Sequence, residues 1–191
     1  MKPKKIVVIG SSAGGPRILK QIFMDLPRLN GSILIVQHMP KFVNESFANN
    51  LNTFSDLTVK VAEDTEQLKP GYVYLAPSEV HMTLKNNERI FLTEGEKVNF
   101  VCPAVDVMFK SLRHEPGLNI IGIILTGMGR DGAEGISYLK KIGGTTIAQD
   151  KESSIIYGMP KEAQDTGCVD YVLNPQEIHD VLIDLLGVIE T

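Results

Sequence analysis

The stretch KIVVIGSSAGGP, residues 5–16, decides the fold. Its first half is a short apolar run, which is typical of a β-strand that is buried on both faces. A turn rich in glycine and serine follows. Pro16 then opens a segment with apolar residues at helical spacing over 18–26, and proline is favoured in the first turn of a helix. The stretch therefore predicts a strand, a tight turn and a helix.

The same succession of apolar run, turn and amphipathic segment continues along the chain. SILIVQ (32–37) and NIIGIIL (119–125) are two further candidates for buried strands. Further strands are expected over 59–62, 72–76, 145–148 and 171–173, helices over 43–51, 104–113, 132–142, 161–166 and 175–186, and a β-hairpin over 82–84 and 89–93. The alternation predicts an α/β fold of three layers, with a doubly wound, mostly parallel sheet and one antiparallel β-hairpin. Nothing divides the chain, so residues 1–191 are expected to form one domain.

Composition excludes several classes of function. The 191 residues carry a formal net charge of −4, and a mildly acidic chain has no general attraction for nucleic acid. No apolar run approaches the roughly 20 residues of a membrane span, and the apolar run near the N-terminus is too short for a signal peptide. Cys102 and Cys168 form no metal signature. We therefore expect a cytoplasmic protein that needs no metal or cofactor.

Three chemically distinctive residues follow three of the buried runs. Ser12 follows the first run, His38 follows the second and Asp131 lies shortly after the third. Ligands of open parallel sheets bind beyond the carboxyl ends of the strands. These are the residue types of a nucleophile, a general base and its orienting carboxylate. Gly10-Ser11-Ser12-Ala13-Gly14 also fits the G-x-S-x-G frame with Ser12 at its centre.

Each residue also has a plainer interpretation. The Gly/Ser loop can be a simple turn, or a phosphate cradle at a helix N-terminus, although it lacks the spacing of dinucleotide and P-loop motifs. A lone histidine such as His38 is more often a packed core residue. Asp131 precedes a helical segment and can be its N-cap. Their occurrence together at equivalent strand ends favours the catalytic interpretation.

Six collinear motifs, running across nearly the whole chain, add a family resemblance. They are IGSSAGGP (9–16), VQHMP (36–40), LKPGYVYLAP (68–77), PAVDVMFKSL (103–112), ILTGMGRDGAEG (124–135) and IAQDKESSIIYGMPKEA (147–163). In these motifs the chain resembles the catalytic domain of the CheB family of chemotaxis protein-glutamate methylesterases. The resemblance implies a doubly wound α/β domain that hydrolyses γ-glutamyl methyl esters on chemoreceptors, releasing methanol, and that in many members deamidates receptor glutamines.

The resemblance also implies roles for individual residues. The family nucleophile falls on Ser12, its base on His38 and its acid on Asp131. The family uses a backbone N–H at the methionine of TGMG to stabilise the transition state, which is Met128 here. The loop that follows the nucleophile would add backbone N–H groups at Ala13 and Gly14.

The chain departs from the family pattern at two places. The position after the nucleophile is often threonine, but here it is Ala13, so a supporting hydroxyl is absent. Relatives commonly carry His-Arg before the Pro-x-Val-Asp stretch, where this chain has Val101 and Cys102. The second departure removes a basic contact and bears on substrate preference.

The expected partners follow from the resemblance. The substrate would be the cytoplasmic helices of a methyl-accepting chemoreceptor, approached without membrane insertion. Family members usually carry an N-terminal receiver domain, whereas this chain enters its first strand near Lys5. A receiver domain is therefore expected to be either removed from this chain or separate from it. Two rival functions stay open from the sequence, a nucleotide- or phosphate-binding module and a family member that binds receptors without catalysis.

Overall fold

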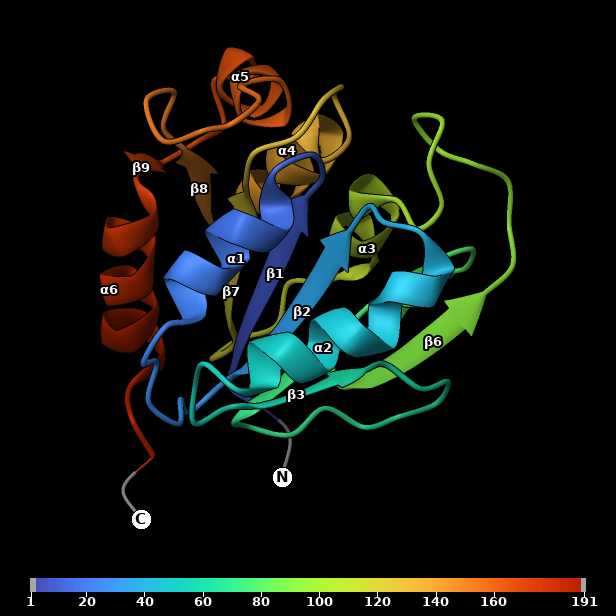
Figure 1. Ribbon diagram of the computed structural model, residues 1–191, viewed down its shortest axis with the longest axis vertical. Coiled ribbons are helices and arrows are strands. Elements are labelled where there is room, and N and C mark those ends of the chain that lie inside the picture. The colour runs from blue at the N-terminus through green and yellow to red at the C-terminus, as the bar shows by residue number, and fades with distance from the viewer. Residues whose placement is uncertain (1–2, 190–191) are drawn as a thin grey trace.

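A seven-stranded sheet in which every pairing is parallel forms the centre of the molecule (Figure 1). The structure is a computed structural model and describes residues 3–189. In spatial order the strands are β3 (Thr58–Val61), β4 (Tyr72–Leu75), β2 (Ser32–Gln37), β1 (Lys5–Ser11), β7 (Asn119–Ile124), β8 (Thr145–Gln149) and β9 (Tyr171–Leu173). The first buried run of the sequence is thus the central strand.

Helices cover both faces of this sheet (Figure 1). One face carries α1 (Gly15–Phe23), α2 (Asn44–Asn52) and α6 (Pro175–Leu186), and the other carries α3 (Val105–Ser111), α4 (Ala133–Lys141) and α5 (Met159–Asp165). Alternate side chains of β1 pack into the hydrophobic cores on the two faces of the sheet. Val7 and Ile9 pack with α1, and Ile6 and Val8 pack with α3. Burial on both faces explains why β1 is continuously apolar.

The expected β-hairpin is present as β5 (His81–Lys85) and β6 (Arg89–Thr93), which pair antiparallel. Met82, Leu84 and Ile90 join the core beneath α3, and the Leu84 N–H donates to Ser111 Oγ at 2.9 Å. A short 3-10 helix, η1 (Lys41–Val43), was not expected. These results confirm the three-layer α/β fold with a mostly parallel sheet and a separate hairpin.

Local sequence explains where two of the helices begin. The helix expected over 161–166 is α5 and begins earlier, at Met159, because Pro160 occupies its first turn. The last helix begins at its predicted residue, Pro175. Asn174 and Glu177 form a reciprocal capping box there, with each side chain accepting the other residue's backbone N–H.

The order of the strands places a topological switch point at the end of β1. The chain leaves β1 towards α1 on one face, whereas it leaves the adjacent β7 towards α4 on the other face. In doubly wound sheets this divergence is where ligands bind, just beyond the carboxyl ends of the strands. Ser12 and Asp131 follow these two strands, so the topology directs attention to this edge.

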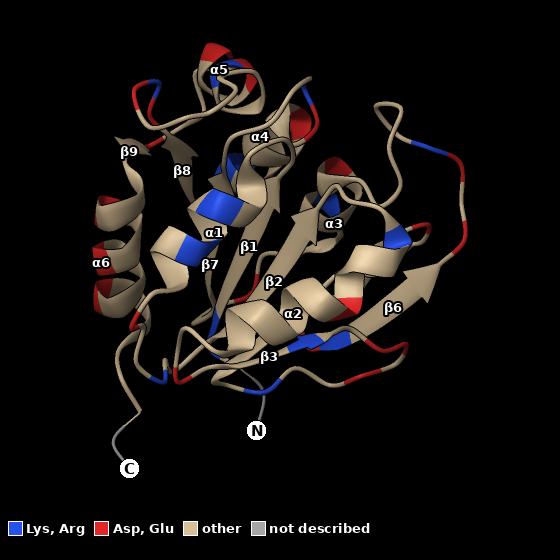
Figure 2. Ribbon diagram, viewed as in Figure 1, with Lys and Arg blue, Asp and Glu red and all other residues tan. Residues whose placement is uncertain are grey.

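Charged side chains are interspersed over the ribbon in the view of Figure 2. Helix α6 bears the acidic residues Glu177, Asp180 and Asp184, while α1 bears Arg17 and Lys20. That view shows no continuous basic band of the kind that follows a nucleic acid backbone. Within residues 3–189 no helix has the length and apolar character needed to cross a membrane.

Candidate active site

The carboxyl ends of β1 and β2 place Ser12 and His38 in equivalent positions. Ser11 and Gln37 are paired in the register of the two strands, and Ser12 and His38 are the residues that follow them. The Ser12 N–H donates to the Thr126 carbonyl oxygen at 3.0 Å, which ties the loop to the end of β7. Ser12 is only partly buried. The hydrogen bond to Thr126 therefore fixes the backbone of Ser12 at the edge of the sheet, where the residue stays partly accessible.

The two adjacent serines have different environments. Ser11 is fully buried, and its Oγ donates to Gln37 Oε1 at 2.6 Å. The Gln37 Nε2 group in turn donates to the carbonyl oxygens of Ser12 at 2.9 Å and of His38 at 3.0 Å. Within residues 3–189 the Ser12 hydroxyl has no hydrogen-bond partner. Ser11 thus supports the loop, whereas the Ser12 hydroxyl is available for chemistry.

Glycines allow the neighbouring loops to approach Ser12 closely. A Cβ placed on Gly127 would lie 2.7 Å from the Ser12 Cβ, which is shorter than any normal contact. A Cβ on Gly14 would lie 2.7 Å from the Ile155 Cβ, and Gly14 also has a φ of 81°. The loops after β1, β7 and β8 therefore meet around Ser12 only because these positions lack side chains.

His38 and Asp131 are hydrogen-bonded. The His38 Nε2 lies 2.9 Å from Asp131 Oδ2, and their side chains are 13% and 4% exposed. The ring nitrogen Nδ1 has no partner within the described residues. When Nε2–H donates this hydrogen bond to Asp131, Nδ1 is the nitrogen that can accept a proton from a nucleophilic hydroxyl. The side chains of Ser12 and His38 are not hydrogen-bonded here, and such bonds often form only when substrate is bound.

The carboxylate of Asp131 is held by more than the histidine. Its Oδ2 accepts from the Val105 N–H at 2.7 Å, and its Oδ1 accepts from the Asp106 N–H at 3.1 Å. Burial alone would raise the pKa of Asp131. Hydrogen bonds from His38 and from the two backbone N–H groups outweigh burial and keep the pKa below its ordinary value of 3.8. Asp131 is therefore ionised, and Gly132, rather than Asp131, is the N-cap of α4.

The three positions predicted to stabilise an oxyanion all present free backbone donors. The N–H groups of Met128, Ala13 and Gly14 have no acceptor within residues 3–189. Met128 and Ala13 are exposed, and Gly14 is the N-cap of α1. Free N–H groups on two loops that meet at Ser12 are suitable donors for a developing negative charge. Their role in catalysis remains a prediction.

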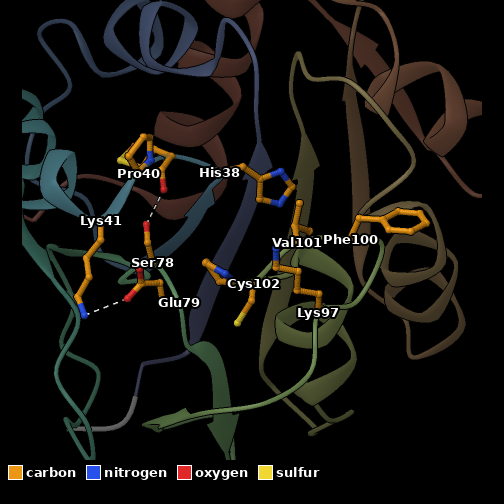
Figure 3. A pocket seen from close by; sticks show the side chains of 11 residues that line it. His38, Pro40, Lys41, Ser78, Glu79, Lys97, Phe100, Val101 and Cys102 are labelled. Atoms are coloured by element: carbon orange, nitrogen blue, oxygen red, sulfur yellow. Dashed lines mark hydrogen bonds and ion pairs between the residues drawn. The ribbon is translucent and has the colours of Figure 1, made fainter.

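A cavity of about 330 Å³ opens beside His38 (Figure 3). It is lined by His38, Met39, Pro40, Lys41, Ser78, Glu79, Lys97, Phe100, Val101, Cys102 and Pro103. Lys41 forms an ion pair with Glu79 at 3.1 Å, whereas Lys97 has no ion-pair partner within the described residues. Val101 and Cys102, the positions that depart from the family pattern, lie in this cavity with Lys97. Positive charge is thus present near them despite the departure.

Two polar residues next to Asp131 were missed by the sequence analysis. Asn99 donates from Nδ2 to Asp131 Oδ1 at 3.0 Å and to Asp106 Oδ2 at 2.8 Å. Asp106 is buried, and its Oδ1 accepts from the N–H groups of Gly132 and Gly135 at 3.0 and 2.6 Å. Asn99 lies in an irregular segment without periodicity, so its sequence carried no signal. Asp106 stands in the Pro-x-Val-Asp motif, which was the available signal.

The remaining candidate ligands do not form a second centre. Cys102 and Cys168 are free thiols, and burial raises the pKa of the Cys102 thiol. His81 is buried and is held by the Ala104 N–H and the Glu96 carbonyl oxygen, at 3.2 and 2.8 Å. Among residues 3–189 there is no group of three or more His, Cys, Asp or Glu side chains arranged to hold a metal ion.

Comparison with known proteins supports the family resemblance. The profile of the CheB methylesterase family matches residues 7–182. A protein-glutamate methylesterase/protein-glutamine glutaminase of Thermotoga maritima is 46% identical over 186 residues, which cover 95% of this chain and 54% of that protein. A protein of the same name from Syntrophus aciditrophicus is 43% identical over 184 residues, covering 96% and 53%.

A solved structure agrees with these sequence matches. The crystal structure of the Thermotoga maritima CheB methylesterase catalytic domain superposes with a TM-score of 0.88 at 44% identity, covering 95% of this chain and 98% of that one. The chain spans about half the length of the curated relatives that it matches. On the family profile, the sequence identity and the shared fold together, the chain belongs to the CheB methylesterase family.

Proposed function

We propose that residues 1–191 form a catalytic domain that hydrolyses γ-glutamyl methyl esters on chemoreceptor proteins, and that it also deamidates glutamine side chains of the same proteins. The observation that carries the proposal is the His38–Asp131 hydrogen bond beside Ser12 at the carboxyl end of the sheet. Family membership and the printed names of the relatives support the substrate class. No cofactor is required for this chemistry.

The first half of the reaction acylates Ser12. His38 accepts the hydroxyl proton at Nδ1 while the Ser12 Oγ attacks the ester carbonyl carbon. Asp131 accepts a hydrogen bond from Nε2–H, which fixes the tautomer and stabilises the imidazolium. The breaking C–O bond releases methanol, which takes the proton from Nδ1. With a glutamine substrate, the same proton transfer releases ammonia.

Backbone N–H groups stabilise the negative charge on the carbonyl oxygen in this step. Met128 supplies one donor from the loop after β7, and Ala13 and Gly14 supply donors from the loop after β1. Loss of one such donor typically lowers kcat by about 10² to 10³. Ala13 contributes no hydroxyl, so the chain relies on backbone donors at this position.

The second half of the reaction removes the glutamyl group. Water loses a proton to His38 Nδ1 and attacks the glutamyl–Ser12 ester. The Ser12–acyl bond breaks, Oγ regains the proton, and the receptor glutamate leaves as a carboxylate. The products are one receptor glutamate carboxylate, one methanol and one proton, released to solvent, for each ester and water consumed.

The partners follow from the same proposal. The substrate is a cytoplasmic helical segment of a methyl-accepting chemoreceptor, which places the domain in the cytoplasm. A receiver domain is the proposed regulatory partner, on the same polypeptide or separate from it. The cavity beside His38, with Lys41 and Lys97, would receive groups that flank the reactive side chain.

A covalent probe tests the proposed nucleophile directly. A fluorophosphonate should label the protein once, and mass spectrometry of proteolytic fragments should locate the adduct on Ser12. His38→Gln should abolish the labelling because the hydroxyl would lack its base. Labelling of Ser11, or none at all in a protein that releases methanol from a methylated receptor fragment, would contradict the proposed triad. Tight nucleotide binding without labelling would favour the alternative function of a nucleotide- or phosphate-binding module.

A further inference from the structure

Asn99 lies at the tip of a tight turn beside the active site. Val98 and Val101 exchange two backbone hydrogen bonds of 3.0 and 3.1 Å, so Asn99 and Phe100 are the two central residues. Their φ angles are 53° and 67°. Two successive left-handed residues define a type I′ turn, which asparagine tolerates and phenylalanine does not favour. Phe100 is 95% exposed, so packing of its side chain does not impose this conformation.

The turn places one amide group between two carboxylates. The Asn99 Nδ2 group donates to Asp131 Oδ1 at 3.0 Å and to Asp106 Oδ2 at 2.8 Å. Apart from His38, Asn99 is the one side chain among residues 3–189 that donates to Asp131. Across the described part of the chain, the donors to the two carboxylates other than His38 and Asn99 are backbone N–H groups, which a side-chain change at Asn99 does not remove.

The two carboxylates influence each other electrostatically. Burial raises the pKa of Asp106, and the negative charge of Asp131 adds to this rise, while hydrogen bonds from Gly135 and Asn99 oppose it. An amide that donates one hydrogen to each carboxylate reduces the repulsion between them. It also reduces the negative charge that the imidazole of His38 experiences from Asp131.

We propose that Asn99 is a positioning residue that acts through Asp131 to set the basicity of His38. The amide offsets part of the charge of the Asp131–Asp106 pair and so limits how strongly the pair stabilises the imidazolium. Backbone donors from Val105 and Asp106 keep Asp131 in contact with His38 without the amide. The consequence for catalysis rests on the proposed function, but the coupling of Asn99 to His38 does not.

Other charged groups also face His38 and have to stay constant in a test. Asp131 contacts the ring directly, and the adjoining cavity carries Lys41, Glu79 and Lys97 together with the Cys102 thiol. Asp131 follows β7, and the groups in the cavity belong to the segments after β2, β4 and β6. None of them is altered by a substitution at the tip of the turn.

The test is an NMR titration of the His38 imidazole in the folded protein, without substrate. The His38 signal is identified as the one that disappears in His38→Gln. Asn99→Gly removes the amide and keeps the turn, because glycine adopts positive φ freely. We expect the pKa of His38 to rise by about 0.5 unit or more, since an uncompensated carboxylate stabilises the imidazolium. Asn99→Ala, a second variant without the amide, should give a rise of the same sign.

Phe100→Gly is the matched control at the neighbouring position of the turn. It relieves the unfavourable φ, leaves the amide in place, and should keep the pKa of His38 within about 0.2 unit of the wild type. An unchanged or lowered pKa in Asn99→Gly would overturn the proposal, as would an equal rise in Phe100→Gly. Where methanol release is measurable, the acid limb of kcat/KM should move to higher pH in Asn99→Gly. The titration needs no turnover, so it stands even if the methylesterase proposal fails.

Discussion

His38 Nε2 lies 2.9 Å from Asp131 Oδ2, although 93 residues separate them in the chain. The sheet brings them together because β2 and β7 are the two neighbours of β1. Ser12 directly follows the strand between them. The ring is oriented from its Nε2 side, so Nδ1 is the nitrogen left for the serine. The segments that follow the central strand and its two neighbours therefore supply all three residues of the proposed triad.

Asp131→Asn should lower kcat strongly while the protein stays folded. An uncharged amide neither stabilises the imidazolium nor selects the required tautomer, and the equivalent change in another serine hydrolase lowers kcat by about 10⁴. Methanol release under saturating substrate measures the effect. A loss of less than about tenfold would show that Asp131 does not orient the base.

The unfolding free energy should depend on pH through Asp131. Its pKa in the folded state lies below the ordinary value of 3.8, so the unfolded chain takes up a proton first as the pH falls. The stabilisation is complete well above pH 3.8 and is lost as the pH falls through the lower folded-state pKa. Urea unfolding at a series of pH values should show that, as the pH falls, the free energy of unfolding decreases less in Asp131→Asn than in the wild type. Equal pH dependence in both proteins would contradict the assignment.

Ser11→Ala should lower the free energy of unfolding, while the rate of methanol release should largely persist. The change leaves the buried Gln37 Oε1 without its 2.6 Å donor, and an unsatisfied buried acceptor typically costs about 1 to 3 kcal/mol. Urea unfolding should report a loss in this range, while methanol release at a temperature where the variant is folded should persist. Complete loss of activity in the folded variant would instead assign the nucleophile to Ser11.

Gly127→Ala should impair catalysis through steric pressure on the nucleophile. The added methyl group would lie 2.7 Å from the Ser12 Cβ, so the loop must move. We expect kcat to fall at least about tenfold, because small displacements of reacting groups are costly. Gly117→Ala is the remote control. It has a φ of 79° and open space around the added atom, so it should lower stability by about 1 kcal/mol and leave kcat unchanged. Normal kcat in Gly127→Ala would show that this close approach does not hold Ser12.

Much of the fold was predictable because its signals are local. The runs at 32–37 and 119–125 are buried on both faces, so their side chains are apolar without alternation, and the structure confirms both strands. The start of α6 follows from Asn174 and Pro175 in the same way. The sequence alone predicts that Ser12, His38 and Asp131 lie near each other, because parallel strands end at one edge of the sheet.

The residues that surround Asp131 were not predictable in the same way. Asn99 contacts two carboxylates that come from α3 and from the loop after β7, and it does so from a turn in which phenylalanine stands where an Asn-Gly signature would have glycine. The role of Gln37 depends on a hydrogen bond to the side chain of Ser11 on the next strand. Both roles depend on contacts between residues that are distant in the chain and adjacent only in the folded protein. Pattern and propensity describe neighbours along the chain and do not report such contacts.

Release of methanol by Ser12→Ala tests the central claim most directly. The purified variant and the wild type are incubated with a methylated chemoreceptor fragment, and methanol is measured over time. The account predicts that the wild type releases methanol and that the folded variant falls to a rate near that without protein, because alanine has no nucleophile for the acyl-enzyme. Methanol release by Ser12→Ala at the wild-type rate would contradict it.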